Sequence, residues 1–137
     1  MSKMIYKKRD KCTPELLRQL SEKENVFFRF HNPYRRLSSR SKSWEMGYES
    51  ELEAIREGSI VLEGKSCTKE AKDLMEFEHA FDSSYVVLAF EGWDTGQTGH
   101  DGEIVATYYK KVKCFNYEDF VKCFDYIDWN WQYIDQI

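Results

Sequence analysis

The run YVVLAFEG, residues 85–92, is the most strand-like stretch of this chain and constrains its fold more than any other. Aromatic and β-branched residues follow one another almost without a break, which is typical of a strand in the middle of a sheet. The segment EIVATYYKKVKCF, residues 103–115, predicts either one long strand or two short ones. Between them WDTGQTGHDG, residues 93–102, has the glycines of a loop. The chain is therefore expected to fold around a β-sheet.

Two earlier runs predict further strands of that sheet. VFFRFH, residues 26–31, is aromatic and β-branched and is stopped by Asn32-Pro33. SIVLEGKS, residues 59–66, has the same character after a loop predicted at 34–47. The charged Arg29 is an anomaly inside the first of these runs.

Helices are predicted where apolar residues recur every three or four positions after a capping residue. The expected helices are residues 14–24 after Thr13, residues 49–58 ending at Gly58, residues 69–81 capped by Thr68, and residues 117–127 capped by Asn116. The strands and helices do not alternate regularly, so the fold class is α+β, with a mixed or antiparallel central sheet packed with short helices. A length of 137 residues suits one domain, residues 1–137.

Charge is distributed unevenly along the chain. Residues 1–42 contain twelve Lys or Arg against four Asp or Glu, a net charge of +8, whereas the other 95 residues carry −12. The densest basic part, RRLSSRSK at 35–42, is consistent with a solvated loop or with contact to nucleic acid. The acidic remainder would repel a phosphate backbone, which disfavours duplex nucleic acid as a partner.

The cysteines and the N-terminus indicate a cytoplasmic protein without a metal site. No pair of cysteines has C-x-x-C spacing, and no histidine lies at the distance of a zinc ligand. No apolar run is long enough to cross a membrane, and MSKMIYKKRD has charges where a signal peptide would be apolar. Reduced thiols, no membrane and a cytoplasmic location are expected.

Three polar positions stand out in chain order on the predicted strands. Arg29 lies within the first strand, Ser66 with Thr68 closes the second, and Glu103 opens a late one. The intervals from Arg29 to Ser66 and from Ser66 to Glu103 are each 37 residues.

This order resembles the arginine-serine-glutamate type of the ADP-ribosyltransferase family. That type has an arginine on its first strand, a Ser-Thr-Ser-like element ending the next, and a glutamate preceded two residues earlier by Glu or Gln. The counterparts here are Arg29, Ser66-Cys67-Thr68 and Asp101-Gly102-Glu103. The surrounding sequence is similar too, in a helix ending in EG and in the runs GKSCTKEA, VVLAFEG, GEIVA and KKVKCF.

The resemblance covers roughly residues 26–115 and departs from the family at two places. Cys67 stands where the family has its middle Thr, and Asp101 replaces the longer acid or amide, which leaves the acceptor amino acid open. A histidine-containing subgroup also exists, so His31 is a possible substitute for Arg29.

The resemblance implies NAD as substrate, a macromolecular acceptor such as a protein, and a class that includes toxins and phage effectors. Cleavage between nicotinamide and ribose builds positive charge on the sugar, as glycoside hydrolysis does. Glu103 would stabilise that charge, and Asp101 would orient the acceptor. Arg29 would bind the anionic part of NAD. Ser66 would hydrogen-bond near the ribose, while Thr68 braces the turn.

Each of these residues also has a structural interpretation. Arg29 can project from the exposed face of an amphipathic strand, Thr68 can cap a helix, and Glu103 can be a strand-edge charge. Asp101-Gly102 is a common turn dipeptide. In either case Arg29, Asp101 and Glu103 are expected outside the core.

Two other classes of function therefore stay open. One is a non-enzymatic interaction or inhibitor protein, including a degenerate ADP-ribosyltransferase-like binder, which uses an aromatic and acidic surface. The other is an accessory protein that contacts nucleic acid through residues 35–42. The tryptophans are expected to pack in the core, with Trp93 also able to line a pocket.

Overall fold

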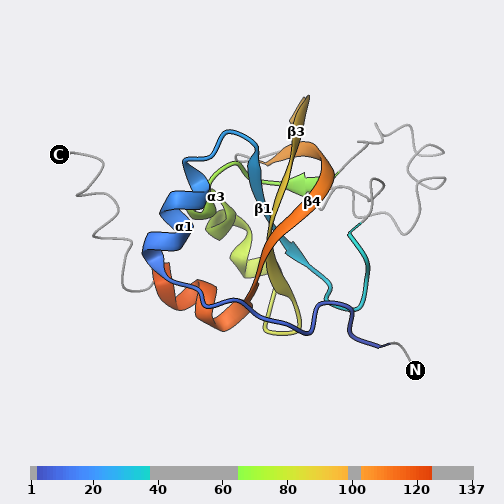
Figure 1. Cartoon of the computed structure of the whole chain (residues 1–137). Coiled ribbons are helices and arrows are strands. Elements are labelled where there is room, and N and C mark those ends of the chain that lie inside the picture. The colour runs from blue at the N-terminus through green and yellow to red at the C-terminus, as the bar shows by residue number, and fades with distance from the viewer. Residues whose placement is uncertain (1–2, 38–64, 99–102, 125–137) are drawn as a thin grey trace.

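A computed structural model describes residues 3–37, 65–98 and 103–124, in which helices gather against one side of a sheet (Figure 1). In chain order the elements are α1 (Pro14–Ser21), β1 (Val26–His31), β2 (Lys65–Cys67), α3 (Ala71–Leu74), the 3-10 helix η1 (Met75–Ala80), β3 (Val86–Thr98) and β4 (Ile104–Asn116). A further helix begins at residue 117 and continues to residue 124, where this described segment ends. The predicted α+β class is confirmed.

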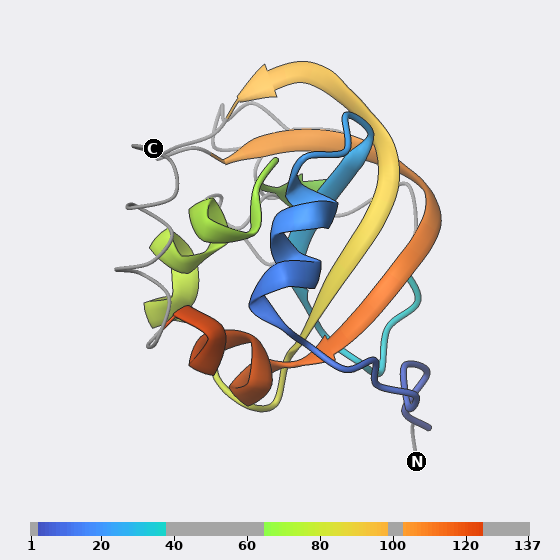
Figure 2. The same cartoon turned by 60° about the vertical axis from the view of Figure 1, so that its left-hand side comes forward.

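The described strands form one antiparallel sheet in the order β1-β3-β4-β2. The long strands β3 and β4 are strongly bent (Figure 2). After β2 the chain passes into Thr68, whose backbone N–H and C=O exchange hydrogen bonds of 2.8 and 2.9 Å with Phe28 of β1. This pair brings the two outer strands together, which accounts for the curvature of the sheet.

Successive side chains of each strand point to opposite faces of the sheet, so the apolar residues form two clusters, one on each face. The helix face packs against the helices and includes Val26, Phe28, Phe30, Val87, Ala89 and Phe115. The second face includes Phe27, Cys67, Leu88, Phe90, Ala106 and Cys114. Both clusters contain residues of β1, so the burial of this strand on both faces explains its uninterrupted run of large side chains.

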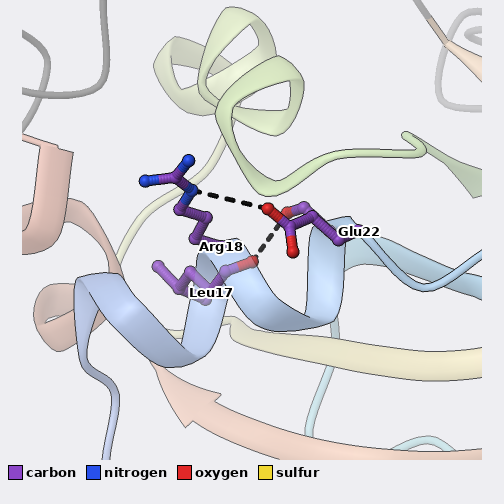
Figure 3. Close-up of polar contacts among 4 residues, drawn as sticks. Leu17, Arg18 and Glu22 are labelled. Carbon is purple, nitrogen blue, oxygen red and sulfur yellow. Dashed lines mark hydrogen bonds and ion pairs between the residues drawn. The ribbon is translucent and has the colours of Figure 1, made fainter. Parts of the chain in front are cut away.

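The first helix begins where its sequence predicts and ends at Ser21, earlier than the predicted end at residue 24. Thr13 accepts a hydrogen bond of 3.1 Å from the backbone N–H of Leu16, and Pro14 occupies the first turn. Leu17 is buried on the helix face. On the other side of α1, Arg18 Nε lies 3.5 Å from Glu22 Oε1 (Figure 3), an exposed pair that contributes only about 0.3 kcal/mol.

The predicted cap of the next helix is wrong. Thr68 does not cap it, because its backbone pairs with β1 and its hydroxyl donates to Glu70 O at 2.9 Å. The N-cap of α3 is Glu70. Ser21 of α1 instead fixes this helix start, since its hydroxyl accepts a 3.0 Å hydrogen bond from Ala71 N. The predicted helix over residues 69–81 becomes four α-helical residues followed by the 3-10 helix η1.

The loop predicted at 93–102 is wrong in its first half, because β3 continues to Thr98. Cross-strand pairing with β4 holds this extension, for example between Trp93 and Thr107. The expectation that Trp93 packs in the core is also wrong. Its side chain is 55% exposed and stacks on Tyr109, with ring centroids 5.5 Å apart. The segment predicted as a strand at 103–115 forms one long strand, β4 (Ile104–Asn116), which is one of the two alternatives predicted.

The helix at 117–124 follows β4 directly and closes the helix face. Phe120, Cys123 and Phe124 are buried there. Asn116, its predicted cap, ends β4 and donates from Nδ2 to Asp119 Oδ2 at 3.2 Å. Within the ranges described, no helix is long and apolar enough to cross a membrane.

Some sequence-based predictions fall outside the described residues. They are the loop at 34–47 beyond Leu37, the helix at 49–58, the first part of the strand at 59–66, the site residue Asp101 and the tail from residue 125.

Candidate functional site

Arg29 lies in the middle of β1 on the second face of the sheet. It pairs with Leu88 of β3 and is only 6% exposed, so the expected position outside the core is wrong. Every residue of β1 is buried, which leaves this strand no exposed face from which Arg29 could project. Arg29 Nε donates a hydrogen bond of 3.4 Å to Phe30 O. A guanidinium in this position needs nearby anionic or polar groups to offset its desolvation.

Glu103 lies immediately before β4 and is 1% exposed, so its expected position outside the core is also wrong. Burial lowers the pKa of Arg29 to about 10, against the opposing effects of Cys67, Glu103 and Tyr6. Burial raises the pKa of Cys67, so this thiol is neutral at pH 7. Of the three groups, Glu103 is the carboxylate, and its electrostatic effect favours the charged form of the Arg29 guanidinium.

His31 shares the face of Arg29 and is 5% exposed. Its Nε2 lies 2.7 Å from Arg35 O, which requires that Nε2 carries the proton and donates it. Burial, together with the charges of Arg29 and Lys65, lowers the pKa of His31 to about 4, against the opposing effect of the hydrogen bond to Arg35. A neutral imidazole is expected at physiological pH.

The strand register places Ser66 and Thr68 away from Arg29. Ser66 pairs with Val105, and Thr68 pairs with Phe28 of the helix face. Because side chains alternate along a strand, Ser66 and Thr68 point to the side opposite Cys67. Both are fully buried. Of the candidate site residues, Arg29 and His31 thus share one face, Glu103 is close enough to act on the pKa of Arg29, and Asp101 lies outside the described residues.

Two residues beside Ser66 were not predicted for the site. Lys65 and Cys67 are on the second face and are buried, with Lys65 2% exposed. Burial and the charge of Arg29 lower the pKa of Lys65 to about 7. The signal that would have found them is strand parity, since residues on either side of Ser66 face the other way.

The N-terminal segment lies against this cluster through Tyr6. The Tyr6 N–H donates to Pro33 O at 3.1 Å, and its hydroxyl accepts a 3.0 Å hydrogen bond from Leu37 N. Its ring meets that of His31 edge to face, with centroids 5.5 Å apart. Tyr6 is also among the groups that act on the pKa of Arg29. It therefore forms part of the cover over the charged residues.

Comparison of this chain with models of protein families, with curated proteins and with solved structures finds no match. In the part of the chain that the structure describes, no group of three or more His, Cys, Asp or Glu residues is placed to hold a metal ion.

The burial of His31 predicts a loss of stability in mild acid. The unfolded chain binds a proton at His31 below pH 6.5, whereas the folded chain resists protonation until about pH 4. Folding stability should therefore fall as pH decreases through this window, by about 2 kcal/mol between pH 7 and pH 5. Urea unfolding at several pH values measures the effect. His31→Gln removes the titrating group and should show a shallower acid slope; equal slopes would contradict the assignment.

Proposed function

We propose that this protein is an NAD-dependent mono-ADP-ribosyltransferase that acts in the cytoplasm on a protein or other macromolecule. The observation that carries the proposal is the burial of Arg29 and Glu103 within electrostatic range of each other. They are 74 residues apart in the sequence, yet both are buried and Glu103 acts on the pKa of Arg29. An arginine on the first strand and a glutamate at the start of a late strand are what the family resemblance implies.

In this proposal the charges have complementary tasks. The Arg29 guanidinium holds the anionic diphosphate of NAD, and the Glu103 carboxylate lies against the ribose that becomes positively charged as nicotinamide leaves. Acceptor attack on the ribose carbon then completes the transfer, with Asp101 orienting the acceptor. The position of Ser66 on the other side of β2 assigns it a supporting role in the strand in place of ribose contact, and Thr68 likewise supports the strand pairing.

Access to the site is a requirement of the proposal. Glu103 is 1% exposed and Arg29 is 6% exposed, so NAD reaches them only when part of their cover moves. Tyr6 is such a part, since it contacts His31 and acts on Arg29. Tyr6 is held by two hydrogen bonds, of 3.0 and 3.1 Å. Because so few bonds hold it, local opening of this segment should cost little free energy.

The direct test uses the purified full chain with NAD labelled in the adenine or in the nicotinamide. The proposal predicts release of nicotinamide, and transfer of adenine label to macromolecules when cell lysate is added. Nuclease and protease digestion of the labelled product then identifies the acceptor class. Neither nicotinamide release nor label transfer by a folded sample would contradict the proposal.

A second candidate, a non-enzymatic binding protein, is favoured by the exposed pair of Trp93 and Tyr109. These rings are 55% and 48% exposed and stack at an interplanar angle of 29°. Exposed aromatic side chains are enriched at binding surfaces because they bury much area with little loss of conformational entropy. On this alternative Trp93→Ala abolishes partner capture from lysate, and NAD is left intact by the wild-type protein.

A further inference from the structure

Two of the four cysteines approach each other from opposite ends of the described chain. Cys12 Sγ lies 3.8 Å from Cys123 Sγ, and both are free thiols. Cys12 directly precedes Thr13, the N-cap of α1, and Cys123 lies on the helix at 117–124. The other two cysteines, Cys67 and Cys114, are buried on the second face of the sheet.

We propose that Cys12 and Cys123 are an oxidation site, at which a small disulfide such as oxidised glutathione introduces one intramolecular disulfide bond. The Cys12 thiolate attacks a sulfur of the small disulfide, forming a mixed disulfide and releasing one thiol. The Cys123 thiolate then attacks the Cys12 sulfur and releases the second thiol. The protein loses two electrons and two protons, and the small disulfide gains both, so the exchange balances. This inference is independent of the proposed function.

The geometry favours this pair over every other pairing of the described cysteines. A sulfur separation of 3.8 Å is a van der Waals contact, so bond formation requires that the two sulfur atoms close to about 2 Å. Cys12 lies outside the regular helix and is partly exposed, which allows both the adjustment and the entry of an oxidant. Cys123 is 6% exposed and contacts Cys12, so it is placed to resolve the mixed disulfide.

The surroundings set the rate of this reaction. Burial raises the pKa of both thiols, and for Cys12 the proximity of Cys123 raises it further. Because the thiolate is the attacking species, oxidation should accelerate about tenfold per pH unit between pH 7 and pH 8.5. Because the reaction is slow at neutral pH, the two thiols should stay reduced unless they are exposed to an oxidant for a long time.

The bond would also change stability. It would join the start of α1 to the helix at 117–124 and enclose the sheet within one covalent loop. Constraining the unfolded chain over so long a loop should raise the melting temperature by about 5 °C or more.

The experiment oxidises the full chain with excess oxidised glutathione at pH 8.5 and counts thiols by alkylation and intact mass. We expect the thiols to fall from four to two, with the bond mapped to Cys12 and Cys123 and the melting temperature raised until dithiothreitol is added. The Cys12→Ser/Cys123→Ser variant should not form a bond, whereas the matched Cys67→Ala/Cys114→Ala variant should.

Other outcomes would overturn the inference. They are four thiols that persist after oxidation, a stable glutathione adduct at Cys12 that Cys123 does not displace, or a bond that maps to a different pair. Single Cys12→Ser and Cys123→Ala variants give the same measurement if the Cys12→Ser/Cys123→Ser variant fails to fold.

Discussion

Glu103→Gln is expected to reduce NAD cleavage and ADP-ribosyl transfer at least about 10²-fold. Glutamine keeps the size and the hydrogen-bonding oxygen of the side chain but removes the charge that would face the developing cation on the ribose. Nicotinamide release measured at saturating NAD, with and without an acceptor, tests both activities. Asp101→Asn should spare NAD hydrolysis more than transfer, because Asp101 is proposed to act on the acceptor.

The same substitution has a structural consequence that must be measured beside activity. Glu103 is 1% exposed and acts electrostatically on buried Arg29, so replacing its carboxyl group with an amide leaves the guanidinium less well compensated. The free energy of unfolding should fall by about 3 kcal/mol. Replacing both residues, in Arg29→Met/Glu103→Gln, should recover part of this loss and restore no activity. A double-mutant cycle should give a coupling of about 2 kcal/mol.

Asp94→Asn is the matched control for Glu103→Gln. Asp94 is an exposed carboxylate of β3 that pairs with Ala106 of the second face, close enough to act on the pKa of Cys67. Its neutralisation should leave both the melting temperature and the NAD activity nearly unchanged. A folded Glu103→Gln protein that cleaves NAD at the wild-type rate would remove Glu103 from the chemistry and end the enzymatic proposal.

The sequence predicted correctly those helices and strands whose start and end are determined by residues adjacent to them in the chain. β1 has the predicted bounds, Val26–His31, because β-branched and aromatic residues run up to Asn32-Pro33. α1 begins where Thr13 and Pro14 place it. The antiparallel or mixed sheet and the α+β class follow from the same patterns and are confirmed.

Burial of the charged residues could not be predicted in this way, because it depends on contacts between distant segments. Arg29 is buried through the pairing of β1 with β3, and Tyr6 from the N-terminus lies against its neighbour on the same face, His31. Glu103 is buried where β4 begins beside β2. The sequence order predicted that these residues share a site but gave no sign that the site is closed to solvent.

At Thr68, pairing with a distant strand prevails over the local preference of threonine for a helix N-cap. A threonine before KEAKDL is a reasonable helix cap, yet its backbone is used by a pair of hydrogen bonds to Phe28, 40 residues away in the sequence. The helix therefore starts two residues later and is anchored by Ser21 of α1. Parity within β2 likewise turns Ser66 away from Arg29, which sequence order alone does not reveal.

Gly92→Ala is expected to be the most destabilising small substitution in β3. A Cβ atom at residue 92 would lie 2.0 Å from the backbone carbonyl oxygen of Thr107, a separation that no rotamer change can relieve. The pairing register also shifts between Glu91 and Gly92, and Gly92 N donates to Asn25 O at 3.0 Å, so the backbone is held from both sides. β3 and β4 must move apart to accept the methyl group.

That movement breaks cross-strand hydrogen bonds in the middle of the two longest strands. We expect a loss of about 3 kcal/mol or more and a fall in melting temperature of about 10 °C. Stacking of Trp93 on Tyr109 should weaken as well, which near-ultraviolet circular dichroism can detect.

Gly96→Ala is the matched control in the same strand. Gly96 has φ of +82°, and nothing lies within 4 Å of a Cβ added there. Alanine at this position is therefore destabilised only by the left-handed backbone conformation. Its cost should be about 1 kcal/mol. The melting temperatures of both variants and the wild type are measured together. They compare the effect of a steric clash between strands, at Gly92, with the effect of an unfavourable backbone conformation, at Gly96. Equal losses, or a greater loss for Gly96→Ala, would mean that the close approach of β3 and β4 at Gly92 does not limit stability.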